Sequence, residues 1–326
     1  MDFFLFLVVN GIAVGGIYAL VALGFVLIYK ATGAINFAQG EVLLMCAYLV
    51  YAFLVQLELP LWLAILAAFV IAMLLGLAIE RLFLRPLVGE PVASVIMVTI
   101  GLAYVLRGVI RFAWGSVERN FPLIFAGPPI AVAGVTVKMV HLWALGLATA
   151  CLVVFSLLFK YSATGVRMRA AADNQRAALS LGIDVNRMFA LSWMVAALLA
   201  AVGAMIIGQM NVLSIELSYI GLTVFPVVIL GGLDSVVGAV IGGLVIGVVE
   251  NLAGGYLGAY LPGAVKFVVP YIVLLVILLI RPYGFFGAVL LSFVPSRPVP
   301  SRPVTRAVPR TVRGRTRAVS APSPRR

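Results

Sequence analysis

Long apolar stretches recur along most of the 326 residues of this chain, and they limit the folds that it can adopt. A helix needs about 20 mostly apolar residues to cross the hydrocarbon core of a bilayer. Windows of this kind can be read at residues 3–29, 37–57, 61–79, 92–114, 140–159, 189–210, 219–233, 236–254 and 265–280. The seventh window is short for a full crossing, which predicts a broken or re-entrant element there.

The composition excludes a water-soluble fold, because 64% of the residues are hydrophobic and only 10% are charged. An ordinary globular domain is roughly half apolar. In a bilayer the backbone must satisfy its own hydrogen bonds, which leaves helices or closed barrels. The first window is too long for a signal-peptide core and lacks a convincing cleavage site, so we expect it to remain as a span. We therefore predict an all-α, polytopic integral membrane helical bundle with about 8–10 transmembrane or re-entrant helices.

The positive charge is concentrated at one end of the chain. The formal net charge is +12, but nine of the 23 basic residues lie in residues 297–326, which contain no Asp or Glu. This Pro-, Ser- and Arg-rich stretch has too little apolar surface to offset its chain entropy. We predict a transmembrane domain over residues 1–294 and a basic, disordered cytoplasmic tail over residues 295–326. Contact with anionic lipid or RNA is one interpretation of the tail; we favour a role in fixing topology and expect no nucleic-acid partner.

Basic residues in the short loops predict the orientation, since cytoplasmic loops are enriched in Lys and Arg. If the first span runs towards the cytoplasm, that side receives Lys30, Arg81, Arg85, Lys160, Arg167, Arg169, Arg176, Arg187 and Arg281. The other side keeps Arg119, Lys138 and Lys266, with Arg107 and Arg111 near the outer half of the fourth span. The N-terminus is thus expected outside and the C-terminus in the cytoplasm. Residues 116–138, broken by Pro and Gly, would form an irregular external loop with room for a short hairpin.

Residues that carry catalytic or metal chemistry are scarce. The sequence contains no G-x-x-x-x-G-K-[ST] segment that would cradle nucleotide phosphates. Its one histidine, His141, stands at a predicted membrane interface with no second imidazole to complete a metal site. Cys46 and Cys151 lie inside apolar runs, where a thiol behaves as a small hydrophobe. We expect no catalytic residue, no metal and no cofactor, so the chain should not be an enzyme.

Three polar side chains, Asn36, Gln39 and Glu41, stand at the mouth of the second window. Capping explains them in one interpretation: Asn36 accepts from first-turn N–H groups, Gln39 reaches back, and Glu41 favours the positive end of the helix. In the other interpretation they line a polar pathway through the membrane. Both interpretations stay open for Glu41, while capping is favoured for Asn36.

A glycine-rich run over residues 231–251 carries a second pair of polar candidates. Small residues at helical spacing allow backbones to approach closely, so we expect these glycines to pack rather than to bind a ligand. Asp234 with Ser235 most simply caps the following helix. Glu250 and Asn251, near the outer end of this span, are candidates for the wall of a water-filled vestibule.

The loop over residues 164–184 carries the signals of a cytoplasmic helix. Thr164 is the predicted N-cap, the interior is rich in alanine, and Gly182 is the predicted C-cap. Its apolar residues form no clean stripe, which favours a helix that inserts into a protein groove over one that lies on lipid. A solvated connecting helix is the alternative.

Five segments together form a specific pattern: GGIYALVALGFVLIYKATGAINFAQGE (15–41), ERLFLRPL (80–87), TIGLAYVLRG (99–108), the loop at 167–183, and GGLDSVVGAVIGG (231–243). With them the chain resembles, over residues 11–286, the permeases of branched-chain amino-acid ABC importers, of the LivH and LivM type. The resemblance implies a multi-pass protein of the bacterial inner (plasma) membrane. It also implies that the chain lies in the lipid bilayer beside a second homologous permease subunit. Two cytoplasmic ATP-binding subunits and a periplasmic solute-binding protein would be its other partners.

The resemblance would make the 167–183 loop the helix that docks into a groove of an ATPase. The loop departs from the E-A-A-x-x-x-G pattern of many importers, since it reads RAAAD from Arg169 and its Gly182 stands farther along. Ala170 and Ala177, seven residues apart, would share one helical face. The predicted coupling residues are Arg167, Arg169, Ala170, Asp173, Ala177 and Gly182, and the predicted pathway residues are Asn36, Gln39, Glu41, Glu250 and Asn251.

The function we predict is half of a translocation pathway for branched-chain or similar small amino acids. ATP hydrolysis in another subunit would drive it and would be coupled through this loop. Relatives of this type also move urea, short-chain amides or other small acids, and these substrates are the alternative. A stand-alone secondary transporter is the rival from another class. It would need carboxylates or cation sites in mid-membrane, whereas the eleven acidic residues stand mostly at predicted span ends or loops.

Overall fold

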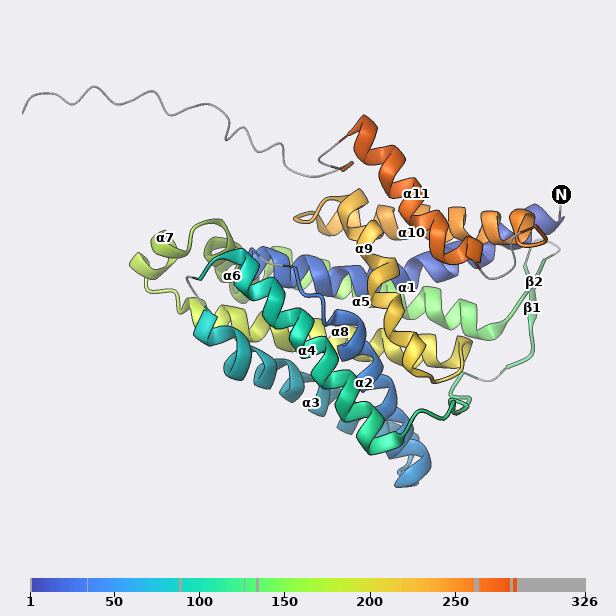
Figure 1. Cartoon of the computed structure of the whole chain (residues 1–326), viewed down its shortest axis with the longest axis horizontal. Helices are drawn as coiled ribbons and strands as arrows, with labels where there is room; N and C mark the ends of the chain where they lie inside the picture. Colours follow the sequence, from blue (N-terminus) through green and yellow to red (C-terminus); the bar gives the residue numbers. More distant parts are fainter. Residues whose placement is uncertain are drawn as a thin grey trace, which may run out of the picture. The chain divides into compact units, whose positions relative to one another are not determined.

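The computed structural model describes residues 2–33, 35–87, 90–125, 127–132, 135–260, 264–281 and 284–285. Within them the chain is a bundle of α-helices with one small β-hairpin (Figure 1). The predicted all-α class is therefore confirmed. The predicted tail over residues 295–326 lies outside the described residues and stays a prediction.

The helices follow the apolar windows closely. They are α1 (Asp2–Thr32), α2 (Gln39–Tyr51), α3 (Leu61–Ile79), α4 (Val92–Trp114), α5 (Met139–Tyr161), α6 (Ala163–Asp173), α7 (Gln175–Ser180), α8 (Val185–Met210), α9 (Ile220–Gly231), α10 (Val236–Leu257) and α11 (Ala264–Ile280). In the described part, seven helical segments are long and apolar enough to cross a membrane, and two apolar helices are shorter, Ile215–Gly231 and Val265–Ile280. This agrees with the predicted range, and the short α9 confirms the broken seventh window.

Several short elements extend or join these helices. A π-helical turn, Ala52–Gln56, continues α2, and another, Glu80–Leu84, continues α3 into the 3-10 turn Arg85–Leu87. A 3-10 turn that we call η4, Ile215–Tyr219, precedes α9. Strands β1 (Ile130–Val132) and β2 (Val135–Val137) pair antiparallel, with Ala131 opposite Thr136. The loop predicted over residues 116–138 thus holds the short hairpin for which it had room.

Helix α1 packs against α10, α8, α5 and α9 and forms the core of the bundle. Of its most apolar 18-residue window, 89% is buried. A Cβ atom on Gly15 would lie 2.7 Å from the Gly243 carbonyl oxygen of α10, and one on Gly247 would lie 2.4 Å from Gly15 Cα. The backbones of α1 and α10 therefore touch directly, which confirms the close packing predicted for the glycine run.

Helix α2 begins inside the bundle, because the chain re-enters after α1. The Phe37 N–H donates to Thr99 Oγ1 (3.3 Å), and the Gln39 amide donates to the Ala196 carbonyl (3.5 Å). At 1.5 Å per residue, Thr99 lies about 10 Å into α4 and Ala196 about 16 Å into α8. Residues 36–41 therefore lie inside the bundle, at and just before the start of α2, the helix of the second predicted span.

Helix α9 also begins inside the bundle, after η4. A Cβ atom on Gly221 would lie 2.6 Å from Gly40 Cα, so the first turns of α2 and α9 touch through their backbones. Pro226 stands within α9 and leaves one helical carbonyl without its N–H partner. Two half-helices thus meet at their N-termini in the middle of the bundle.

The helix predicted over residues 164–184 is in fact two helices, α6 and α7, which are divided at Asn174. Asn174 has extended dihedrals (φ −152°, ψ 101°), and its side chain accepts from the Ala177 N–H (3.0 Å). This local hydrogen bond ends α6 and caps α7. Ala170 and Ala177 therefore lie on different helices instead of sharing one face.

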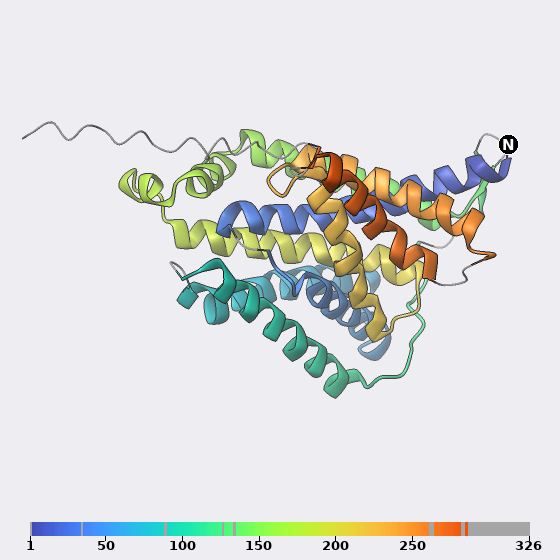
Figure 2. The same ribbon diagram turned by 45° about the horizontal axis from the view of Figure 1, so that its top comes forward.

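Both ends of this helix pair have clear caps. Ser162, not Thr164, caps α6, because its hydroxyl accepts from the Gly165 N–H (2.9 Å). Gly182 follows α7 with φ +77°, the left-handed conformation predicted for a C-terminal glycine. The helices α6 and α7 lie at the opposite end of the bundle from the N-terminus and the β1–β2 hairpin, in both Figure 1 and Figure 2. We refer to these ends as the α7 end and the hairpin end.

Candidate functional site

Two amide side chains fix the re-entrant segment before α2. Asn36 Oδ1 accepts from the Ala38 N–H (3.0 Å), and Asn36 Nδ2 donates to Gln39 Oε1 (3.0 Å). Both side chains are buried. Asn36 therefore caps a turn, as sequence reasoning favoured, although the residue at the N-cap position of α2 is Ala38. Asn36 and Gln39 thus hold the start of α2 in place inside the bundle.

Glu41 is buried in the first turn of α2 and forms an ion pair with Arg107 of α4. Arg107 Nη2 donates to Glu41 Oε1 and also to Ser218 Oγ (3.3 Å), in η4. The guanidinium lies over the rings of Tyr104 (5.8 Å to the centroid) and Tyr219 (5.6 Å). Within the described residues, Arg107 Nε is buried without a hydrogen-bond partner. The Nε–H of the guanidinium thus has no acceptor among the described residues.

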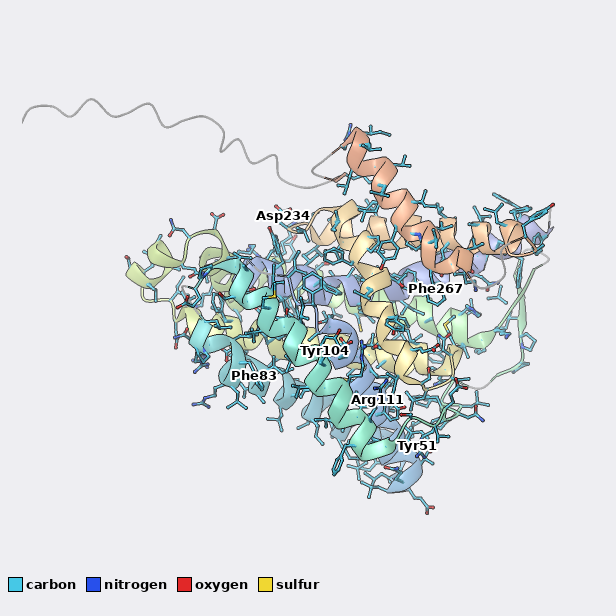
Figure 3. The ribbon with its side chains drawn as sticks, in the orientation of Figure 1. Tyr51, Phe83, Tyr104, Arg111, Asp234 and Phe267 are labelled. Atoms are coloured by element: carbon cyan, nitrogen blue, oxygen red, sulfur yellow. The ribbon has the colours of Figure 1, made fainter. Side chains whose placement is uncertain are left out.

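A cavity of about 290 Å³ adjoins this ion pair, and we call it the ion-pair cavity. Its wall consists of Phe37, Gly40, Glu41, Ile100, Ala103, Tyr104, Arg107, Ser218, Tyr219, Gly221 and Leu222. Tyr104, which lies along α4 with Arg111 (Figure 3), is 70% exposed. The cavity therefore borders the outer surface of α4, η4 and α9, where Tyr219 and Leu222 are also exposed.

Sequence reasoning singled out Glu41 but missed its partner. Arg107 and Glu41 are 66 residues apart, so no local pattern connects them. The available signal was the position of Arg107, well inside the fourth apolar window, where a charge needs a partner or water.

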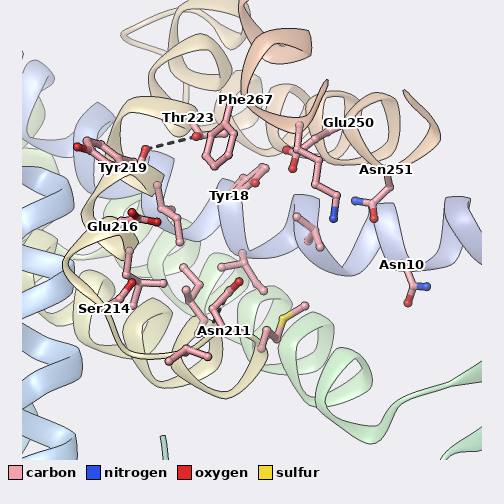
Figure 4. Close-up of a pocket in the computed structure, with 18 of the residues that line it drawn as sticks. Asn10, Tyr18, Asn211, Ser214, Glu216, Tyr219, Thr223, Glu250, Asn251 and Phe267 are labelled. Carbon is pink, nitrogen blue, oxygen red and sulfur yellow. Dashed lines mark hydrogen bonds between the residues drawn. The ribbon is translucent and has the colours of Figure 1, made fainter. Parts of the chain in front are cut away.

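A larger cavity, of about 650 Å³, lies towards the hairpin end, and we call it the outer cavity (Figure 4). Glu250 and Asn251, both predicted to face a vestibule, contribute to its wall. Glu250 is 94% buried, and within the described residues its Oε2 has no hydrogen-bond partner. Tyr18 and Lys266 interact with it electrostatically. Other polar groups in this wall are Asn10, His141, Asn211, Ser214, Glu216, Tyr219 and Thr223.

Tyr219 lines both cavities. It lies at the end of η4, whose Ser218 faces the ion-pair cavity and whose Glu216 and Leu217 face the outer cavity. This single turn therefore forms the partition between two polar spaces.

The predicted coupling residues divide into an anchor and an exposed set. Arg169 donates to the carbonyls of Phe159 and Lys160 and lies over the Phe159 ring (5.4 Å), so it fastens α6 to the end of α5. Ala170 is half-buried. The exposed residues are Arg167, Asp173, Ala177 and Gly182. Arg169, Ala170 and Asp173 also line a cavity of about 690 Å³ at the α7 end, together with Lys30 and Asp234.

Comparison with known proteins gives a consistent result. The family model described as "Branched-chain amino acid transport system / permease component" matches residues 7–278. The chain is 32% identical over 254 residues to the high-affinity branched-chain amino acid transport system permease protein LivH of Salmonella typhimurium and to LivH of Escherichia coli, covering 73% of this chain and 82% of each relative. It is 30% identical over 245 residues to BraD of Pseudomonas aeruginosa, covering 71% of this chain and 80% of BraD.

Among solved structures, PsaBC from Streptococcus pneumoniae in complex with Fab has a TM-score of 0.47 at 13% identity, over 86% of this chain and 91% of that chain. We draw no conclusion from that comparison. The match of the family model over most of the chain, the identity to LivH and BraD, and the bundle of apolar helices agree with one another. The chain belongs to the family of branched-chain amino acid transport system permease components.

Proposed function

We propose that this chain is the permease subunit of an ATP-driven ABC importer for branched-chain or similar small amino acids, and that it forms half of the translocation pathway. The Glu41–Arg107 pair carries this proposal. A charged side chain at the centre of a membrane helix costs about 3 kcal/mol on insertion scales, and such groups face the bundle interior or a water-filled space. The cavity beside this pair borders an outer surface, so we infer that this surface faces a polar pathway completed by a second homologous permease.

The energy for transport would come from two cytoplasmic ATP-binding subunits. Helices α6 and α7 support this view. They lie at the end of the bundle opposite the β-hairpin, and their Arg167, Asp173 and Ala177 are exposed and could contact a partner. A periplasmic solute-binding protein would then deliver the solute at the hairpin end. Selection of the solute would rest mainly on that protein, since a conducting pathway must release what it binds.

The relatives' names supply the substrate class, because LivH and BraD are permease proteins of branched-chain amino acid transport systems. Urea, short-chain amides and other small acids are the alternatives. A secondary transporter that works alone also needs a direct test, since the carboxylates of Glu41 and Glu250 are buried within the bundle.

Reconstitution in proteoliposomes tests the proposal. The chain alone should show no ATPase activity and no concentrative uptake of labelled leucine. The complete set of two permeases, two ATPases and binding protein should accumulate leucine when ATP is supplied, and should accumulate urea or acetamide far less. Concentrative uptake by the chain alone under a proton or sodium gradient would establish the secondary transporter instead.

A further inference from the structure

We infer that the ion-pair cavity binds the charged head of a zwitterionic α-amino acid, with the ammonium group on Glu41 and the carboxylate on Arg107. This inference rests on the proposed function and assigns a substrate-binding site within it.

The donors of Arg107 are arranged for a second carboxylate. A guanidinium has five N–H donors in a rigid planar fork, and it binds carboxylates through two parallel hydrogen bonds. Arg107 uses Nη2 for both Glu41 and Ser218, while its buried Nε has no partner within the described residues. Arg107 lines the cavity and its side chain is 22% exposed, so an incoming carboxylate can reach the guanidinium from the cavity in place of Glu41.

The pairing of charges favours a ligand that carries both signs. In the empty cavity, Glu41 and Arg107 neutralise each other. A zwitterion inserts one charge of each sign, so that each protein charge keeps an opposite partner. A plain amine or a plain carboxylic acid engages one protein charge and leaves the other without its partner in a poorly solvated place. The site should therefore select against both partial analogues.

The remaining wall suits an aliphatic side chain. Phe37, Ile100, Ala103 and Leu222 line the cavity beside the ion pair, and the Phe37 ring contacts the Phe225 ring at 5.5 Å. The volume of about 290 Å³ is at the lower end of the range for small-molecule pockets, about 300–1,000 Å³. The ion pair can thus bind the charged head of a small amino acid, and the apolar wall can contact its aliphatic side chain.

The position of the cavity gives it a route of entry. Tyr219 separates the ion-pair cavity from the outer cavity and is held over the Arg107 guanidinium. A carboxylate binds in the plane of the Arg107 guanidinium and the Tyr219 ring lies over its face, so Tyr219 can stay in place beside a bound head group. A ligand that arrives from the outer cavity would have to pass Tyr219 to reach Arg107.

The test uses the complete transporter in nanodiscs without the binding protein, and measures equilibrium binding of labelled leucine. Competitors are 4-methylpentanoate, which lacks the ammonium group, and isopentylamine, which lacks the carboxylate. Glu41→Gln and Arg107→Gln should each weaken leucine binding on the order of ten-fold or more, because a charged hydrogen bond is lost. Glu41→Gln should also reduce the preference for leucine over 4-methylpentanoate, and Arg107→Gln the preference over isopentylamine. A purely structural role would weaken all three ligands alike in both variants and would not make each variant lose a different preference.

A matched control exists at the α7 end, where Arg85 and Glu80 form an ion pair at 2.9 Å outside all three cavities described above. Arg85→Gln should leave leucine binding and both preferences unchanged. Arg107→Lys keeps the charge opposite Glu41 but loses the fork. It should assemble normally and still bind leucine several-fold more weakly, so it tests the site if the glutamine variants fail to assemble.

Wild-type uptake of leucine by the complete transporter, measured in parallel, separates the two proposals. If wild type transports leucine and the Glu41 or Arg107 variants bind it with unchanged affinity and preferences, the binding site is refuted and the proposed function stands. If the complete wild-type transporter neither binds nor accumulates leucine, the proposed function is overturned and the site with it.

Discussion

At Gly15 of α1, a Cβ atom would lie 2.7 Å from a carbonyl oxygen of α10, and real Cβ atoms essentially never come this close to another heavy atom. Without a hydrophobic driving force between helices, membrane bundles depend on such close contacts for packing. Gly146 of α5 is different, since a Cβ there would meet nothing within 4 Å. Two glycines in apolar helices thus have opposite tolerance for a side chain.

Gly15→Val should destabilise the bundle by about 1–3 kcal/mol or more, because the added atoms force the two backbones apart. Gly146→Val adds the same side chain to an exposed position and should change stability little. Membrane abundance and the melting temperature of the purified protein measure the difference. Equal melting temperatures for the two variants would contradict the packing described for α1 and α10.

Helices α6 and α7 form an element with its own caps, which connects α5 to α8 at the α7 end. Its exposed residues project from the bundle, whereas Arg169 anchors its base to α5. This arrangement allows surface changes in α7 that spare the membrane helices. If α6 and α7 are the contact with an ATPase, such changes should uncouple transport from ATP hydrolysis.

Ala177→Glu places a charge on the exposed side of α7 and should abolish docking in any groove that the helix fills. Ala163→Glu places the same charge on an exposed residue at the start of α6 and should be tolerated. Co-purification of the ATPase and uptake of labelled leucine are the measurements. Full uptake by the Ala177→Glu variant at normal abundance would make α7 a solvated connector.

Gly182→Val tests the same element through its backbone. Gly182 has φ +77° with open space around it, so the substitution adds left-handed strain of about 1 kcal/mol or more and no clash. Gly115→Val is the matched control, because Gly115 has φ +79°, equally open space, and a position after α4 at the hairpin end. We expect reduced uptake for Gly182→Val only, with both variants present in the membrane.

For the whole molecule, the structure places the α7 end opposite the hairpin end, and the charges predict which end faces the cytoplasm. A reporter that is active only in the periplasm should be silent when it is fused after Pro295. Fused after Glu58, in the turn between α2 and α3, the same reporter should be active, since Gln56 contacts Trp114 at the hairpin end. The reversed pattern would invert the predicted orientation.

The sequence was sufficient for the helical spans, because apolar length is a local property that each window carries by itself. It placed the Gly182 cap and the glycine packing for the same reason. It failed at Asn174, where one side chain competes with the helix backbone, and at Ser162, which lies two residues before the predicted cap. It also missed the Glu41–Arg107 pair and the contacts that hold the start of α2 inside the bundle. Both depend on contacts between residues of α2, α4 and α8, and these helices are far apart in the sequence.

The central position of α1 has a consequence for biosynthesis. This helix leaves the ribosome before its neighbours α8 and α10, which begin only at Val185 and Val236. In a nascent chain that ends before α10, Gly15 lacks its close contact with Gly243, so α1 is made before the helix against which it packs. The packing of α1 against α10 can therefore form only after the chain has been made as far as α10.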